Sequence, residues 1–534
     1  MDFSQFECID PSRIGEFASP WNELLDRSPH RLLPESSIRF DWKRRLDSLS
    51  SRDGGPQALC ADLVEYNRKL GAPRTLLSKA ERIFAGSGGV VIAGQQPGLF
   101  GGPLYTLFKA LTAVTLARSL EESYGIPVLV VFWNAGDDDD FHEVRSCTLA
   151  QPDGDLFTIS AERDGDDGRL CVGGIPIERV RAVLGPVRTI LGLWGEGSGR
   201  IAGLIGDSLA SGRWGDHFSR LLTTIFDGSL LVYDALSSIW RTEAAPLIER
   251  FVAGRDTILS GLRKREEQMR SLGVVPPIQP RTIDIPLTYI DGGIKRKFSD
   301  WDRQRIEGIL GSEPSRLNPN VTLRAPLQDA LFPVIASVVG PGETAYLPQL
   351  SPVYDGLGIE EPIRVPRFTA TLVPSGLRGV AEAIGVTRSG LYLEWERCIG
   401  EYIEAGLPEG FSERIDELAG IVEDRGRRLV AGFRKGGELE RDIERIKTSI
   451  RKLRRRGGAV RLGELEQQGF KPARLRRFLR PKGLLQERIL SSLVPLAAGL
   501  PVSSGTLAEL ASTHLERLRS LGSGHYLVDL PMMD

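Results

Sequence analysis

A strand–loop–helix–strand unit near the start of the chain constrains the fold more than any other feature. Residues 88–94 form a short β-branched run bounded by glycines, which is typical of a buried parallel strand. A Gly/Pro-rich loop over residues 95–103 follows, and then a helical stretch over residues 104–124 that Gly125 ends. A second apolar strand spans residues 128–133. Such a unit requires a parallel sheet with a right-handed crossover.

The same alternation continues further along the chain. Residues 218–226 have a helical pattern, and residues 229–234 form another apolar run that ends in a carboxylate. Residues 284–289 and 294–298 form a hairpin-like pair around Asp291-Gly292-Gly293. We therefore predict an α/β fold with a doubly wound, parallel-sheet core and connecting insertions.

The pattern changes after about residue 374. Apolar residues follow heptad spacing over residues 411–429 and form an a/d seam over residues 439–453, with Gly436-Gly437 between the two runs. We predict a helical hairpin able to form a coiled coil; the alternative is two amphipathic helices packed on the core. The predicted parts are a core over residues 1–375, a helical coiled-coil arm over residues 376–475, and a segment over residues 476–534 that returns to the core.

Composition excludes several classes of partner and site. The chain has 68 Lys and Arg against 70 Asp and Glu, a net charge of −2, so neither nucleic acid nor an anionic membrane is expected as a partner. The longest apolar runs are too short to span a bilayer as a helix, and the acidic first residues do not resemble a secretory signal. The five cysteines are widely spaced without a Cys-x-x-Cys pair, which argues against a disulfide framework and a thiolate zinc site. We expect a cytoplasmic protein.

The loop after the first strand is the first candidate site. Ligands of open α/β sheets bind where strand carboxyl ends meet helix amino termini, and free N–H groups there favour anions. Glycines allow a ligand to approach the backbone, although a tight turn demanded by packing would explain them equally well. The candidate residues are Gly94, Gln95, Gln96, Gly98, Gly102 and Lys109.

A run of four aspartates follows the second strand. Asp138 and Asp140 belong to this run, which begins shortly after Trp133. Consecutive carboxylates repel one another, so they are either solvated or bind a cation, an amine or a polyol; Mg²⁺ would suit such hard oxygen ligands. An acidic, solvent-exposed turn is the alternative, but the position at the end of an apolar strand favours a functional role.

The third cluster lies between residues 318 and 367. Arg324 and Arg367 could form bidentate hydrogen bonds to a carboxylate or phosphate, and buried structural ion pairing is the alternative for each of them. Glu343 follows a Gly-Pro-Gly turn that can present its carboxylate to a cleft.

Taken together, these clusters closely resemble the bacillithiol biosynthesis cysteine-adding enzyme family (BshC). The matches run in order from about residue 90 towards the carboxyl end, which makes their combination specific. The matching residues are 93–99, 102–106 with Lys109, Phe132-Trp133 through Asp140-Phe141 with Glu143, Asn320-Val321 with Arg324, Gln328, 340–343 with Tyr346, Pro366-Arg367, and 481–483 with Gln486-Glu487-Arg488.

The resemblance implies a Rossmann-like, nucleotidylyltransferase-like core and a coiled-coil arm that mediates homodimerisation. It implies a ligase that joins the carboxyl group of L-cysteine to the amino group of glucosaminyl malate in the last step of bacillithiol biosynthesis. An amide made from a free carboxylate needs an activated acyl group, and adenylation by ATP with Mg²⁺ would supply one by analogy with aminoacyl-tRNA synthetases.

The site residues carried over fall into two groups, and none is assigned as a metal ligand. The catalytic candidates are Asp138, Asp140, Lys109 and Glu343. The candidates for binding substrate or nucleotide are Gly94, Gln95, Gln96, Gly98, Gly102, Tyr105, Trp133, Asn320, Arg324, Gln328, Tyr346 and Arg367.

Two positions depart from the family pattern. The family's acidic motif usually has a histidine where this chain has Asp139, and its Tyr-Thr-Ile-His-Lys motif has a histidine where this chain has Phe108. These changes remove two imidazoles from any general acid–base role. They motivate two alternatives, a ligase of the same fold for another amino acid or amine, and a non-catalytic dimer that binds a nucleotide or metabolite.

Overall fold

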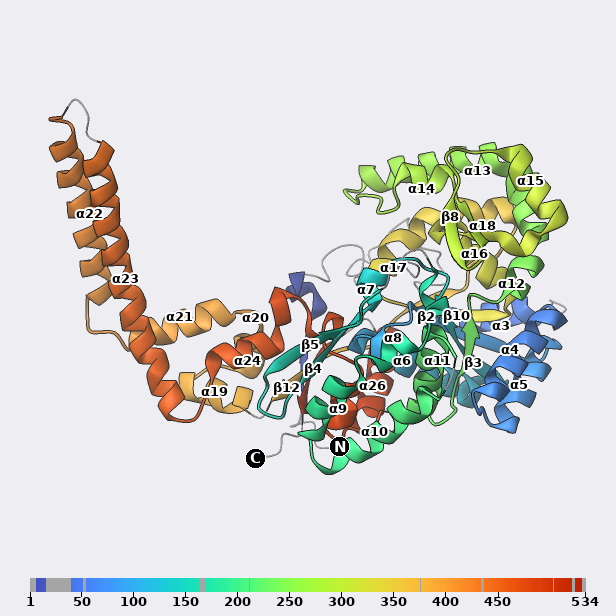
Figure 1. Ribbon diagram of the computed structural model, residues 1–534, viewed down its shortest axis with the longest axis horizontal. Helices are drawn as coiled ribbons and strands as arrows, with labels where there is room; N and C mark the ends of the chain where they lie inside the picture. Colours follow the sequence, from blue (N-terminus) through green and yellow to red (C-terminus); the bar gives the residue numbers. More distant parts are fainter. Residues whose placement is uncertain are drawn as a thin grey trace. The chain divides into compact units, whose positions relative to one another are not determined.

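A computed structural model gives the fold in two compact units (Figure 1). It describes residues 6–15, 40–50, 54–163, 170–210, 212–374, 376–433, 437–502, 504–520 and 524–530. The larger unit comprises Cys8–Leu372 and Leu484–Asp534, and the smaller unit comprises Val373–Gly483 together with Phe6 and Glu7. In the described part of the chain, none of the helices combines the length and apolar character needed to cross a bilayer.

The larger unit is built around a sheet of five parallel strands, which confirms the predicted fold class. In chain order these are β2 (Gly89–Gln95), β3 (Val128–Asn134), β6 (Leu231–Asp234), β10 (Val334–Val339) and β11 (Ile363–Pro366). Their order across the sheet is β11-β10-β2-β3-β6. The chain thus builds outward from β2 on one side and then returns to its other side. The carboxyl ends of β2 and β10 form the topological switch point, where open α/β sheets bind ligands.

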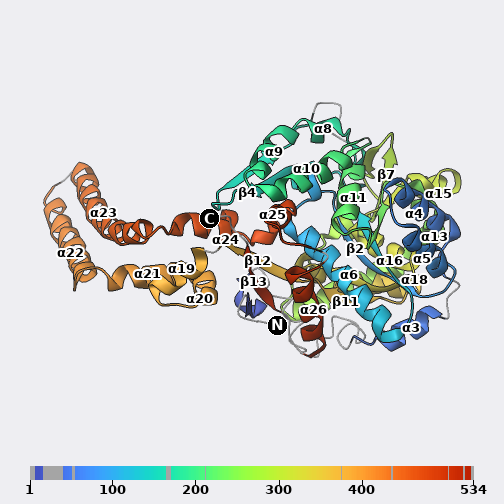
Figure 2. The ribbon, with the colours of Figure 1, turned by 90° about the horizontal axis from the view of Figure 1, so that it is seen from below.

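Helices cover both faces of this sheet. The helix α6 (Leu104–Tyr124) has the predicted bounds, because Gly125 ends it in the left-handed conformation at φ +65°. It lies against β2 and β3, beside α26 (Thr506–Ser520) (Figure 2). On the opposite face, α4 (Gln57–Lys69) and α5 (Arg74–Phe84) pack on a buried core. Both faces being covered explains why the strands read as continuous apolar runs.

Small antiparallel elements are inserted between the parallel strands. The predicted hairpin is confirmed as β7 (Leu287–Asp291) and β8 (Ile294–Lys297), with β9 (Leu317–Pro319) on the other side of β7. The hairpin begins later than predicted, because Pro280 initiates a short helix, α14 (Pro280–Asp284), which takes up the preceding residues.

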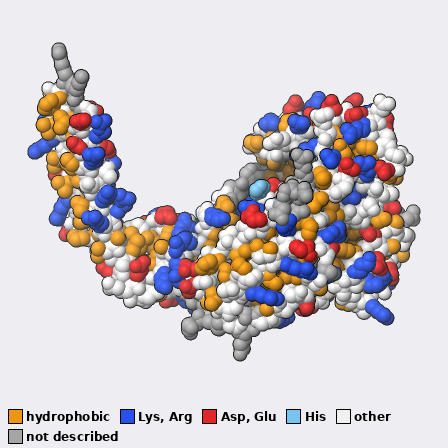
Figure 3. Space-filling view, viewed as in Figure 1, with side chains coloured by type: hydrophobic (Ala, Val, Ile, Leu, Met, Phe, Trp, Pro, Cys, Tyr) orange, Lys and Arg blue, Asp and Glu red, His pale blue; other side chains and the backbone are white. Residues whose placement is uncertain are grey.

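In the smaller unit, α22 (Phe411–Val430) and α23 (Gly437–Gln467) pack side by side (Figure 1). Ile443 lies so close to Gly426 that a Cβ there would come within 2.8 Å of its side chain, and Lys447 pairs with Glu423 at 3.2 Å. The predicted coiled coil stays a prediction. Large apolar side chains remain exposed along this pair of helices and the residues just after α22 (Figure 3): Leu418, Ile421, Leu429, Phe433, Leu439, Ile446, Leu453 and Val460.

Candidate functional site

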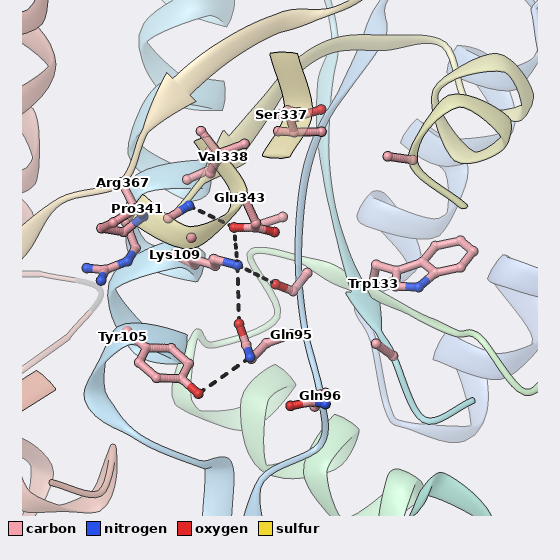
Figure 4. A pocket seen from close by; sticks show the side chains of 18 of the residues that line it. Gln95, Gln96, Tyr105, Lys109, Trp133, Ser337, Val338, Pro341, Glu343 and Arg367 are labelled. Carbon is pink, nitrogen blue, oxygen red and sulfur yellow. Dashed lines mark hydrogen bonds and ion pairs between the residues drawn. The ribbon is translucent and has the colours of Figure 1, made fainter. Parts of the chain in front are cut away.

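A cavity of about 540 Å³ lies at the switch point of the sheet (Figure 4). Its lining comes from the carboxyl ends of β2 and β10, from α6, and from α16 (Val321–Leu331) and α17 (Pro341–Tyr346). All three sequence clusters meet here, since the carboxyl ends of parallel strands share one edge. The predicted site residues in the lining are Gly94, Gln95, Gln96, Tyr105, Lys109, Trp133, Asp138, Arg324, Gln328, Glu343, Tyr346 and Arg367.

Four predicted site residues lie outside this lining and shape the backbone. A Cβ on Gly98 would come within 2.5 Å of Gly102 Cα, and Gly102 itself adopts φ +71°. Asp140 caps the short helix α7 (Phe141–Val144) by accepting from the backbone N–H of His142 at 3.1 Å. Asn320 caps α16 by accepting from the backbone N–H of Thr322 at 2.9 Å.

The loop between β2 and α6 is fixed from outside. Trp214 Nε1 donates to the carbonyl oxygen of Pro97 at 2.5 Å. The backbone N–H of Ser492 donates to the carbonyl oxygen of Gly102 at 2.9 Å, and that of Leu104 donates to Leu490 at 2.8 Å. Residues 490–492 therefore hold the conformation of a loop that lies almost 400 positions before them in the sequence.

Lys109 joins the two sides of the switch point. Its Nζ donates to the carbonyl oxygen of Gly94 at 2.8 Å and to Gln95 Oε1 at 3.2 Å, and it pairs with Glu343 Oε2 at 2.5 Å (Figure 4). The same carboxylate oxygen accepts from the backbone N–H of Gly340 at 2.7 Å. Burial lowers the pKa of Lys109 against the opposing effect of Glu343. All three N–H donors of the ammonium group thus have protein acceptors.

Arg367 also has a protein partner. Its guanidinium makes a two-pronged contact with the buried carboxylate of Glu487, with Nη1 at 3.0 Å from Oε2, and Thr369 Oγ1 donates to Oε2 at 2.7 Å. Burial opposes ionisation of Glu487, but the charge of Arg367 holds its pKa below the usual value. Of the two interpretations of Arg367, buried ion pairing is the one that its geometry matches.

The acidic run meets a lysine from the β7–β8 hairpin. Lys295 Nζ lies 3.6 Å from Asp139 and 4.0 Å from Asp138. Asp138 Oδ2 accepts from Gln96 Nε2 at 2.7 Å, and its Oδ1 accepts from the backbone N–H of Asp139 at 2.7 Å. Burial acts to raise the pKa of Asp138, but Lys295 and Gln96 lower it below its usual value. Within the described ranges, no three His, Cys, Asp or Glu side chains are grouped to hold a metal ion.

Arg324 and Gln328 lie one turn apart on the face of α16 that lines the cavity. Burial would lower the pKa of Arg324, but Asp137, Tyr346 and Asp138 raise it above its usual value. None of the carboxylates in the described residues lies within 4.0 Å of its guanidinium. Arg324 therefore carries a positive charge without an ion pair.

Several lining residues were not assigned to the site from the sequence. Arg364 is buried and pairs with Asp329 at 3.0 Å while donating to Ser337 Oγ at 2.9 Å. Glu143 and Arg488 also line the cavity. Glu143 and Arg488 belong to the motifs that resemble the BshC family, and that resemblance could have assigned them to the site. Nothing in the local sequence around Ser337 or Arg364 marks these two as site residues.

Phe108 and Asp139 are the two positions where the family has a histidine. Phe108 is buried in the core and packs edge-on against Phe368, with ring centroids 5.1 Å apart. Asp139 points to Lys295. Neither Phe108 nor Asp139 is therefore among the described residues that line the cavity.

Comparison with known proteins gives a consistent family. Residues 35–368 match the model of "Bacillithiol biosynthesis BshC, N-terminal Rossmann-like domain". A protein of Bacillus cereus (strain B4264) named "Putative cysteine ligase BshC" is 28% identical over 477 residues, covering 84% of this chain and 87% of its own. Proteins of the same name from Geobacillus thermodenitrificans and Heliobacterium modesticaldum are 27% and 25% identical, covering 84% and 85% of this chain and 87% and 88% of their own.

Proposed function

Because the chain belongs to the bacillithiol biosynthesis BshC family, we propose that it is a cysteine ligase that joins L-cysteine to glucosaminyl malate through an amide bond. The observation that carries this proposal is that all three motif clusters converge on one cavity at the switch point. Its volume of about 540 Å³ falls within the usual range for small-molecule sites.

The cavity residues suggest a division of roles. Asp138 stays ionised at neutral pH, and with Glu143 it supplies negative charge for the amino group and hydroxyls of the sugar. Lys109 and Glu343 hold the ends of β2 and β10 in register, so that reacting groups meet in a fixed geometry. Activation of the cysteine carboxyl group by ATP is part of the proposal, since an amide does not form readily from a free carboxylate.

Location and assembly complete the proposal. The enzyme acts in the cytoplasm, and it forms a homodimer through α22 and α23, whose exposed apolar side chains would be covered by a second copy. Sedimentation of the intact chain would test the dimer. Replacing Leu418, Ile446 and Leu453 by glutamate should yield monomers, whereas an unchanged dimer would contradict the assignment of this surface.

The function is tested by mass spectrometry of purified protein incubated with L-cysteine and glucosaminyl malate, with and without ATP and Mg²⁺. A product of the mass of bacillithiol that requires ATP supports both the reaction and its activation. A matched pair of variants sharpens the assay: Asp138→Asn should abolish product, whereas Asp256→Asn, at a side chain 99% exposed, should not. A panel of other amino acids and amines addresses the alternative ligases. Turnover of another pair instead, or ligand binding without any turnover, would refute the proposal.

A further inference from the structure

The lining of the cavity draws residues from both faces of the sheet. Side chains of successive strand residues point to opposite faces. Ile92 and Trp133 belong to the core cluster that includes residues of α16, whereas Lys109 and Tyr105 come from α6 on the other face. Figure 4 shows Trp133 on the other side of β2 from Lys109 and Tyr105. We call the two parts the α16 lobe, with Trp133, Arg324, Gln328 and Tyr346, and the α6 lobe, with Gln95, Tyr105, Lys109, Glu343 and Arg367.

Several of the cations that line the cavity already have a carboxylate partner. In the α6 lobe, Lys109 is neutralised by Glu343 and Arg367 by Glu487. On the other side, Arg364 is neutralised by Asp329. Arg324 and Arg488 remain, because in the described part of the chain no carboxylate reaches ion-pair distance of either guanidinium. Of the two, Arg488 is the one whose charge acts on Tyr105 in the α6 lobe. A partly buried guanidinium of this kind is stabilised when an anion occupies the adjoining space.

Neutral donors surround the same space. The side-chain amide of Gln328 lines the α16 lobe one turn along the helix from Arg324. The hydroxyl of Tyr346, which hydrogen-bonds to Arg324, also lines this lobe. A guanidinium fork beside an amide fits the planar, bidentate geometry of a carboxylate. The lining also includes the small residues Gly94, Ala135 and Ala325.

We propose that the α16 lobe binds a non-reacting carboxylate of the malyl group of glucosaminyl malate, with Arg324 as its counter-ion. The inference rests on the proposed function and deepens it. Binding of this carboxylate by Arg324 would orient the substrate, because Asp138 lies close enough to Arg324 for the two charges to interact. With the malyl group in the α16 lobe, the amino sugar extends towards Asp138, and L-cysteine takes the α6 lobe.

The experiment compares Arg324→Met, Arg324→Lys and Gln328→Leu with the wild type. The matched control is Arg263→Met, at a side chain 70% exposed and away from the cavity. Calorimetric titrations with L-malate and with glucosaminyl malate measure binding, and steady-state kinetics give KM for each substrate. We expect Arg324→Met to weaken both ligands at least tenfold, Arg324→Lys and Gln328→Leu to weaken them less, and KM for L-cysteine to stay within twofold.

Two results would overturn the inference. One is equal affinity of the wild type and Arg324→Met for L-malate and glucosaminyl malate. The other is a rise in KM for L-cysteine with that for glucosaminyl malate unchanged, which would place the cysteine carboxylate in the α16 lobe. Failure of the proposed function looks different: the wild type would form no product, while binding of L-malate that depends on Arg324 would still support the carboxylate site.

Discussion

Replacing Lys109 by methionine tests whether the ion pair of Lys109 with Glu343 at the switch point stabilises the fold. The side chain of Lys109 is 5% exposed and that of Glu343 is 29% exposed. Removing one partner of a buried ion pair typically destabilises a protein by roughly 3–5 kcal/mol, because a buried charge is left without compensation. The carboxylate of Glu343 would still accept from the N–H of Gly340 and would still contact solvent. We therefore expect a destabilisation at the lower end of this range, about 3 kcal/mol.

The assay is urea unfolding followed by tryptophan fluorescence. Trp395 is the one tryptophan of residues 373–483, so the signal mainly reports the larger unit. A double-mutant cycle with Glu343→Gln isolates the pair, and the double variant should be at least about 1 kcal/mol more stable than the sum of the single effects predicts. A free energy of unfolding for Lys109→Met within about 0.5 kcal/mol of the wild type, or strict additivity in the cycle, would refute a stabilising role for the Lys109–Glu343 ion pair.

Further predictions concern the loop, the acid range and the buried pair. Gly98→Ala should lower activity more than tenfold by forcing its Cβ to within 2.5 Å of the facing backbone. The control Gly308→Ala, in the helix α15 (Arg303–Ser312) and outside the cavity lining, should leave activity unchanged, since nothing lies within 4 Å of the added Cβ. Burial lowers the pKa of His217 to about 4 in the folded state from about 6.5 when unfolded, so the unfolded state takes up the proton first and stability falls as pH drops from about 6.5 towards 4. At pH 5 the free energy of unfolding is lower by about 2 kcal/mol because of His217. His217→Gln should abolish this part of the pH dependence when urea unfolding at pH 7.5 is compared with that at pH 5. Glu487→Gln should destabilise the protein by roughly 3 kcal/mol in the same assay, since it leaves a buried guanidinium uncompensated; no change would contradict the pair.

Local signals made much of the fold predictable. The strand β2 and the helix α6 are bounded by Gly and Pro residues whose backbone preferences act within a few residues. Convergence of the three clusters was also predictable, because a parallel sheet brings strand ends to one edge. The smaller compact unit runs over Val373–Gly483, and its limits depend on tertiary contacts that no local signal in the sequence marks.

What the sequence could not supply is which charges are already neutralised. Arg367 and Arg324 looked alike as candidate anion-binding residues. The structure separates them, since the partner of Arg367 lies 120 positions away in the chain. Lys295 likewise reaches the acidic run from a hairpin more than 150 residues later. Long-range pairing of this kind depends on the tertiary fold and leaves no periodic trace in the sequence.

The attachment of the β2–α6 loop to residues 490–492 has a consequence for synthesis of the protein. All five strands of the parallel sheet are present in a nascent chain by residue 366. Residues 490–492, which complete the loop, and Glu487, which pairs with Arg367, are still to be translated at that point. A ribosome-bound chain can therefore assemble its sheet while the ligand cavity is unfinished. Catalytic competence then arises only when the last part of the chain emerges, so that substrates meet finished molecules rather than growing ones.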